Sequence, residues 1–109
     1  MTPRLATSVL AGALIRKAQG EGGFAAVLAK GDPTAGAILL LLTERGGPPT
    51  LLERLLKPDG SYSWARPIDD PSQVPEFVAR RRRFDPDLWV LELDVPSVER
   101  FTAEMTAFD

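Results

Sequence analysis

Hydrophobic and polar positions follow two different periods along this chain, and each period predicts one kind of secondary structure. Near the N-terminus, apolar residues recur at the spacing of one helix face, at Leu5, Ala6, Val9, Leu10, Ala13 and Leu14. Thr2-Pro3 is a helix-start signal, and the glycines that begin at Gly20 stop a helix. This part of the sequence predicts a helix over residues 3–19.

Two neighbouring stretches predict strands that are apolar on both faces. Residues 24–30 are small or apolar up to the final lysine, and residues 37–43 are apolar up to the final threonine. Because a strand that is apolar on both faces must be covered on both sides, we expect residues 37–43 to lie centrally in a sheet. Residues 31–34 form a turn around Pro33, so the two strands are predicted to form a hairpin or an adjacent pair.

Residues 50–57 fit two descriptions. Thr50 and Glu53 make a capping-box pattern and the leucines between and after them have helical spacing, which favours a helix. Asp59-Gly60 is a strong hairpin turn signal, and residues 62–68 alternate as a strand does, which favours a strand. The strand over residues 62–68 needs a partner and this segment is nearest, so we favour the hairpin and leave the helix as the alternative.

The turn signal also predicts the register of this hairpin. If Asp59-Gly60 is a two-residue loop, Leu55 faces Trp64 and Glu53 faces Arg66. Both are favourable pairs across neighbouring strands, since one is apolar and the other joins opposite charges.

The last third of the chain predicts two helices around one strand. A helix is expected near residues 73–83, with one buried face made of Val74, Phe77, Val78 and Phe84. Residues 88–95 alternate between apolar and mixed positions, which is typical of a half-buried strand. Pro96-Ser97 opens a final helix, with Ser97 as its N-cap.

The predicted order of elements is therefore α-ββ-ββ-α-β-α. Tight hairpins imply mainly antiparallel pairing. One mainly antiparallel sheet of about five strands with helices packed on it is the α+β arrangement. The length of 109 residues fits a single domain over residues 1–109.

Composition narrows the possible chemistry. The chain has no cysteine and no histidine, which excludes disulfides, cysteine- or histidine-ligated zinc, haem ligation and any histidine-based catalytic triad. We therefore expect no cofactor and no metal. The net charge of -2 argues against a strongly basic nucleic-acid domain.

The apolar runs also bear on location. The longest, residues 35–42, is shorter than the roughly 20 residues that cross a bilayer. Arg16-Lys17 follows the N-terminal apolar stretch where a signal peptide would have small residues. We expect a cytoplasmic protein with no membrane partner.

Two stretches carry a resemblance to a known family. They are GFAAVLAKGDPTAGAILL at residues 23–40 and RRRRFDPDLWVLEL at residues 80–93, and the best signature is FDPDLWV at residues 84–90. With the N-terminal helix, they resemble the alphaproteobacterial family called domain of unknown function 1491, as far as about Asp94. The resemblance implies a bacterial cytoplasmic protein of about one domain, and it supplies no activity, cofactor or catalytic residue.

The run Arg80 to Arg83 is the most conspicuous charge cluster. Consecutive helix residues point about 100° apart, so the four side chains do not form one patch. Arg81 falls near the middle of the buried face, where its stem lies on the core, and Asp85 and Asp87 are the nearest acids for it. Asp85-Pro86-Asp87 itself is expected to form a turn. We thus predict structural roles for Arg81, Asp85 and Asp87.

The two tryptophans lie in different surroundings. Trp89 lies in an apolar strand and is expected in the core, a structural role. Trp64 lies beside Tyr62 and Arg66, where it is either core or part of an exposed aromatic patch that marks an interaction surface.

Three functions remain open. The first is a non-enzymatic interaction module that self-associates into a homodimer or binds a protein partner, favoured by the lack of a convergent catalytic set and by the open edges expected of a sheet. The second is weak binding of an anionic ligand or nucleic acid through Trp64, Arg82 and Arg83. The third is an unrecognised enzyme that uses Asp85, Asp87 or Arg81.

Overall fold

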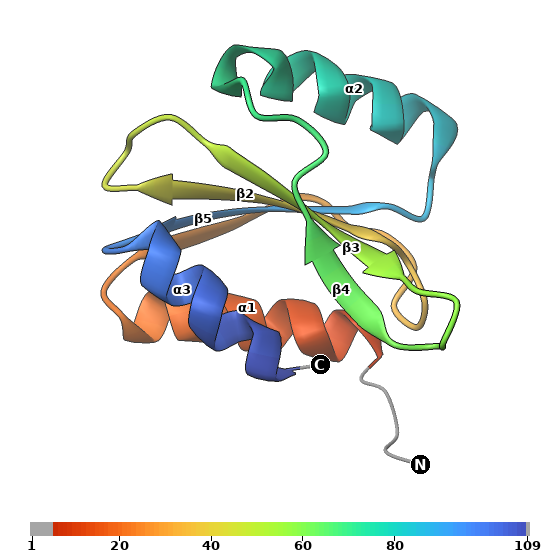
Figure 1. Cartoon of the computed structure of the whole chain (residues 1–109), viewed down its shortest axis with the longest axis horizontal. Coiled ribbons are helices and arrows are strands. Elements are labelled where there is room, and N and C mark those ends of the chain that lie inside the picture. The colour runs from red at the N-terminus through yellow and green to blue at the C-terminus, as the bar shows by residue number, and fades with distance from the viewer. Residues whose placement is uncertain (1–5, 109) are drawn as a thin grey trace.

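The architecture is one twisted sheet with helices on both faces (Figure 1). The computed structural model describes residues 6–108. Within these residues the elements are α1 (Thr7–Gly20), β1 (Phe24–Ala29), β2 (Ile38–Glu44), β3 (Thr50–Leu56), β4 (Tyr62–Ala65), a 3-10 turn (Pro71–Gln73), α2 (Val74–Phe84), β5 (Trp89–Val95), α3 (Val98–Met105) and a second 3-10 turn (Thr106–Phe108). The predicted order and the α+β class are confirmed.

The sheet has the strand order β1-β5-β2-β3-β4. Three of its pairings are antiparallel, and the central one, between β2 and β5, is parallel. α1 and α3 cover one face and α2 covers the other (Figure 1). The edges of the sheet are therefore β1 on one side and β4 on the other.

The prediction that β1 and β2 are neighbours was wrong, because β5 lies between them. The loop that joins them holds the start of β5: Asp32 N donates to the carbonyl of Asp87 at 3.0 Å, and Trp89 Nε1 donates to the carbonyl of Asp32 at 2.7 Å. At Gly31 an added Cβ would lie 2.0 Å from the same Asp87 carbonyl oxygen, so only glycine fits there.

β5 has the half-buried pattern that its sequence predicted. Its residues facing the α1–α3 core are at most 5% exposed, namely Trp89, Leu91, Leu93 and Val95, whereas Glu92 on the opposite face is exposed. Val90, on the same face as Glu92, is buried in the cluster under α2. This burial fits a strand that has β1 on one side and β2 on the other.

Residues 50–56 form a strand, so the favoured hairpin is confirmed and the helical alternative is wrong. The predicted register was wrong by one residue: Arg54 faces Trp64, Leu55 faces Ser63 and Glu53 faces Ala65. The turn is built on Pro58-Asp59, with Gly60 N donating to the Lys57 carbonyl and Gly60 left-handed at φ 87°. This longer loop shifts every pair and therefore the face of each side chain.

The ends of the helices differ in part from the prediction. Ala6 is extended and α1 begins at Thr7, while the predicted start at Thr2-Pro3 lies outside the described residues. Ser97 caps α3 as predicted, since its side chain accepts from Arg100 N at 3.2 Å. Phe84 does not share the buried face of α2: it is the last residue of the helix, lies beyond the core cluster under α2 and is 80% exposed.

Candidate functional site

The β1 edge exposes three large apolar side chains, distributed over both faces of the sheet. Phe24, Val27 and Leu28 are 75%, 46% and 44% exposed, and β1 contains no charged residue. A register shift between Val27 and Ala29 leaves Leu28 as a bulge. Edge strands of monomeric proteins are usually protected by charge, by proline, by a bulge or by a covering segment. β1 has the bulge but no charged residue and no proline, so most of its length is an open pairing edge.

Charge is distributed unequally along this edge. In the first half of β1, Ala26 pairs with the exposed Glu92 of β5. At its end, Lys30 is exposed and lines a cavity with Leu28 and Arg82 of α2, to which Asp85 also contributes. The first half of the strand is therefore beside an acidic side chain, and its end is beside two basic side chains and one acidic one.

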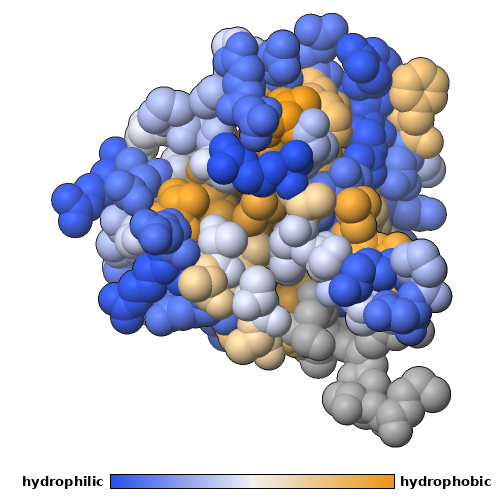
Figure 2. Space-filling model, in the orientation of Figure 1, coloured by the Kyte–Doolittle hydropathy of each residue, from blue (hydrophilic) through white to orange (hydrophobic). Residues whose placement is uncertain are grey.

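A groove lies along the β4 edge of the sheet. α3 and the second 3-10 turn form its other wall, and its lining residues are Leu52, Tyr62, Ser63, Trp64, Arg66, Thr102 and Thr106. Its volume is about 460 Å³. Figure 2 shows side chains of intermediate hydropathy on this part of the surface, with both hydrophobic and hydrophilic ones beside them. The groove combines aromatic walls with hydroxyl groups.

Two features beneath the groove are unusual for a core. Trp64 packs against the α1–α3 core, yet its Nε1 is buried without a hydrogen-bond partner among the described residues. Arg54 is 4% exposed, and its guanidinium lies 3.7 Å from the centre of the Tyr62 ring. The stacked cation holds the ring of Tyr62 in place.

The structure does not bring together the residues of the predicted arginine–tryptophan surface. Trp64 packs against the sheet face that α1 and α3 cover, whereas Arg82 and Arg83 are exposed on α2, over the other face. A ligand that contacts Trp64 in the groove is thus separated from both arginines by the sheet.

Arg81 has a different acidic partner from the one predicted. It pairs with Glu53 of β3 and not with Asp85 or Asp87, so the predicted pairing was wrong. The reason is that α2 lies across the sheet, which places Arg81 over β3, while the carboxylate of Asp85 accepts from the backbone N of Asp87 at 3.0 Å. The turn formed by Asp85-Pro86-Asp87 is closed by Leu88 N donating to the Asp85 carbonyl at 3.3 Å.

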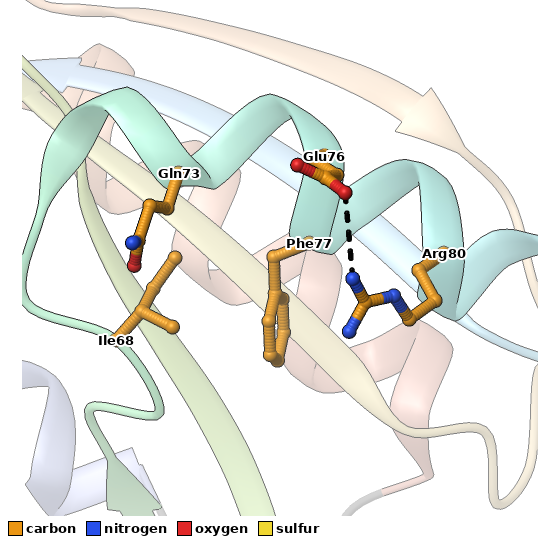
Figure 3. A pocket seen from close by; sticks show the side chains of 5 residues that line it. All are labelled: Ile68, Gln73, Glu76, Phe77 and Arg80. Carbon is orange, nitrogen blue, oxygen red and sulfur yellow. Dashed lines mark hydrogen bonds and ion pairs between the residues drawn. The ribbon is translucent and has the colours of Figure 1, made fainter.

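A smaller cavity of about 240 Å³ lies beside α2 and is lined by Ile68, Gln73, Glu76, Phe77 and Arg80 (Figure 3). The guanidinium of Arg80 is 3.4 Å from the carboxylate of Glu76, one turn earlier on the same helix. Because the lining holds one acidic and one basic side chain, the charges of this cavity favour neither an anion nor a cation.

Titratable groups outside these regions join α1 to α3. Lys17 Nζ lies 2.6 Å from a carboxylate oxygen of Glu104 in α3 and 2.6 Å from one of Glu21. Both carboxylates raise the pKa of Lys17, and the effect of Glu104 is the larger. Lys17 and then Arg100 lower the pKa of Glu104. Within residues 6–108 no three acidic residues gather as metal ligands do, and no helix is long and apolar enough to cross a membrane.

The fold and these surfaces define an α+β protein with two differently built sheet edges. The chain belongs to the family described as protein of unknown function (DUF1491), whose model matches residues 5–103. The resemblance noted in the sequence is thereby confirmed. No curated protein matches the chain.

Solved structures from two bacteria share this fold. A crystal structure of a DUF1491 family protein from Caulobacter crescentus is 34% identical, with a TM-score of 0.79, covering 89% of this chain and 94% of that one. An NMR structure of a DUF1491 family protein from the same organism is 33% identical, with a TM-score of 0.81 and coverage of 92% and 94%. A solution structure of an A. tumefaciens protein is 28% identical, with a TM-score of 0.72 and coverage of 91% and 92%.

Sequence reasoning missed the groove at β4. Arg54, Thr102 and Thr106 were not singled out, because α3 follows β4 in the chain by more than 30 residues and no local pattern joins them. One signal was present: Arg54 shares a strand face with Leu52, and a charge on an apolar strand face indicates a special site.

Proposed function

We propose that this protein is a non-enzymatic interaction module that forms a homodimer by pairing β1 of two copies. The observation that supports it is the open edge of β1, which is uncharged and has three large apolar side chains 44–75% exposed. Pairing two such edges satisfies the outward backbone groups and covers part of these apolar side chains on each face of the sheet. The proposal includes the cytoplasmic location expected from the sequence, which fractionation of the native cells tests.

The distribution of charge favours a second copy as the partner. In an antiparallel pair related by a two-fold axis, the end of one strand lies beside the start of the other. Lys30 of each copy then approaches Glu92 of its partner, and opposite charges meet at both ends of the interface. A parallel pairing would place like charges side by side.

The remaining candidates have weaker support. Nucleic acid would need a basic surface, but Arg81 is paired with Glu53 and Arg80 with Glu76, which leaves Arg82 and Arg83 with the nearby Lys30. An enzyme that uses Asp85 would need its carboxylate free, whereas that carboxylate accepts a backbone hydrogen bond within a turn. We therefore give Arg81, Asp85 and Asp87 structural roles in this proposal.

Light scattering coupled to size exclusion tests the proposal. The wild-type chain is expected to approach twice the mass of one chain as its concentration rises, and Leu28→Lys is expected to return it to the mass of one chain. Leu56→Lys is the matched control, because Leu56 is 59% exposed and lies on β3, which two strands separate from β1. Phe24→Lys gives a second variant of the edge.

Two results would overturn the proposal. One is a wild-type chain that keeps the mass of a monomer at high micromolar concentration. The other is a dimer that Leu56→Lys disrupts as strongly as Leu28→Lys does. Circular dichroism of each variant shows that a loss of dimer does not come from a loss of fold.

A further inference from the structure

We propose that the groove between β4 and α3 binds a small molecule that has a flat apolar body and a carboxylate group. This site is independent of the β1 interface, because β4 is at the opposite edge of the sheet. The groove volume of about 460 Å³ falls within the roughly 300–1,000 Å³ typical of small-molecule sites.

The walls of the groove favour a flat apolar body. Tyr62 and Trp64 contribute aromatic rings and Leu52 contributes an aliphatic side chain. The Tyr62 ring is fixed from below by the buried guanidinium of Arg54, so this wall does not have to become ordered when a ligand binds. A planar hydrocarbon or aromatic group stacks against such a surface.

The charge of the lining favours an anion. Arg66 is the charged residue among the described lining residues, and no acid lines the groove. The partner of Arg66 is Asp69 at 3.8 Å, in a pair whose two side chains are 54% and 91% exposed. Such an exposed pair is weak, so a carboxylate can replace Asp69 at the guanidinium.

The indole of Trp64 reports on the groove, because its ring forms part of the wall. Its Nε1 is enclosed without a partner among the described residues, whereas Nε1 of Trp89 donates to the carbonyl of Asp32 at 2.7 Å. Because this nitrogen is enclosed, a ligand in the groove contacts the ring of Trp64 and changes the surroundings of its N–H without bonding to it. Ser63, Thr102 and Thr106 offer hydroxyl groups to the ligand.

A small molecule fits this edge better than a peptide strand does. β4 has four residues, all half-buried, which is a short length for an added strand to pair with. We therefore assign the groove to a small carboxylate and make a peptide an outcome of the test.

Nitrogen–proton correlation spectra of the full chain, titrated with naphthoate, test the assignment. We expect the indole resonance of Trp64 to move while that of Trp89, already hydrogen-bonded, stays in place. Uncharged naphthalenemethanol is expected to bind at least fivefold more weakly. Arg66→Gln should weaken naphthoate by a similar factor and leave naphthalenemethanol unchanged, and Arg82→Gln, on α2, should change neither.

Three results would overturn the assignment. The first is a Trp64 indole resonance that does not move at millimolar naphthoate. The second is equal binding of naphthoate by the wild type and by Arg66→Gln. The third is a response to an extended peptide, confined to the β4 amides, with none to naphthoate.

Discussion

The two edges of the sheet differ in how they meet solvent. β1 is six residues long, uncharged and open, with Phe24 75% exposed. β4 is four residues long and half-buried, and α3 and the second 3-10 turn form the far wall of a groove along it. A short, half-buried edge offers little length for another strand to pair with, whereas an open apolar edge needs a partner. We therefore propose association for the β1 edge and ligand binding for the β4 edge.

The largest expected effect concerns stability at the two edges. Trp64→Ala should lower the free energy of unfolding by about 2–3 kcal/mol, because Trp64 packs against the α1–α3 core. Phe24→Ala should change it by less than about 0.5 kcal/mol, because Phe24 is mainly exposed. Denaturant unfolding at a concentration where the chain is monomeric measures both. If the two variants lose the same unfolding free energy, the side chains of the two edges do not differ in burial as described.

The next effect concerns the helix layer over the middle of the sheet. Glu53→Gln removes the acidic partner of Arg81, whose side chain is 29% exposed, and should cost about 1–2 kcal/mol of unfolding free energy. Asp87→Asn, in an exposed turn, is the control and should cost less than about 0.5 kcal/mol. If Asp87→Asn proves the more damaging change in thermal unfolding, the pairing with Glu53 does not hold α2 to the sheet.

Exchanging the charges of Lys30 and Glu92 tests the antiparallel pairing proposed for the β1 edge. Lys30→Glu places two acidic residues together in the proposed dimer and should weaken it by about fivefold, which corresponds to about 1 kcal/mol. Adding Glu92→Lys restores opposite charges in the exchanged order and should recover most of the affinity. Sedimentation at several concentrations gives the dissociation constants. A double variant weaker than the single one argues against an antiparallel pair.

The smallest effect is a dependence on pH of the contact between α1 and α3. The pKa of Glu104 is lowered by Lys17 and then Arg100, so its stabilising contribution is present above its usual pKa and is lost as pH falls through the lowered value. The pKa of Lys17 is raised, so its contribution is lost only as pH rises through that raised value. Glu104→Gln should therefore reduce the fall in melting temperature on the acidic side. If the melting temperature of Glu104→Gln falls at acidic pH as steeply as that of the wild type, the ion pairs of Glu104 do not cause this pH dependence.

Local patterns predicted the elements well, because each depends on nearby residues. The spacing of Leu10 and Leu14 predicted α1, and Ser97 predicted the start of α3. The sheet order was not predictable in the same way. The pairing of β5 with both β1 and β2 depends on contacts between Asp32 and Asp87 and between Asp32 and Trp89, which are more than 50 residues apart.

The candidate sites were predictable only in part. Trp64 was singled out, but a one-residue error in the hairpin register placed it opposite Leu55 when it faces Arg54. Gly60 caused this error, because it adopts the left-handed conformation as the last residue of a longer turn. The partner of Arg81 was missed for a related reason, since Glu53 precedes it by 28 residues and meets it only when α2 crosses the sheet.

Amide hydrogen exchange, compared at low and high protein concentration, tests the difference between the edges most directly. The outward amides of β1 (Phe24–Ala29) should become protected as concentration rises, while those of β4 (Tyr62–Ala65) should exchange at the same rate at both concentrations. Exchange in β1 that does not depend on concentration would contradict the account, because it would show that the open edge has no partner.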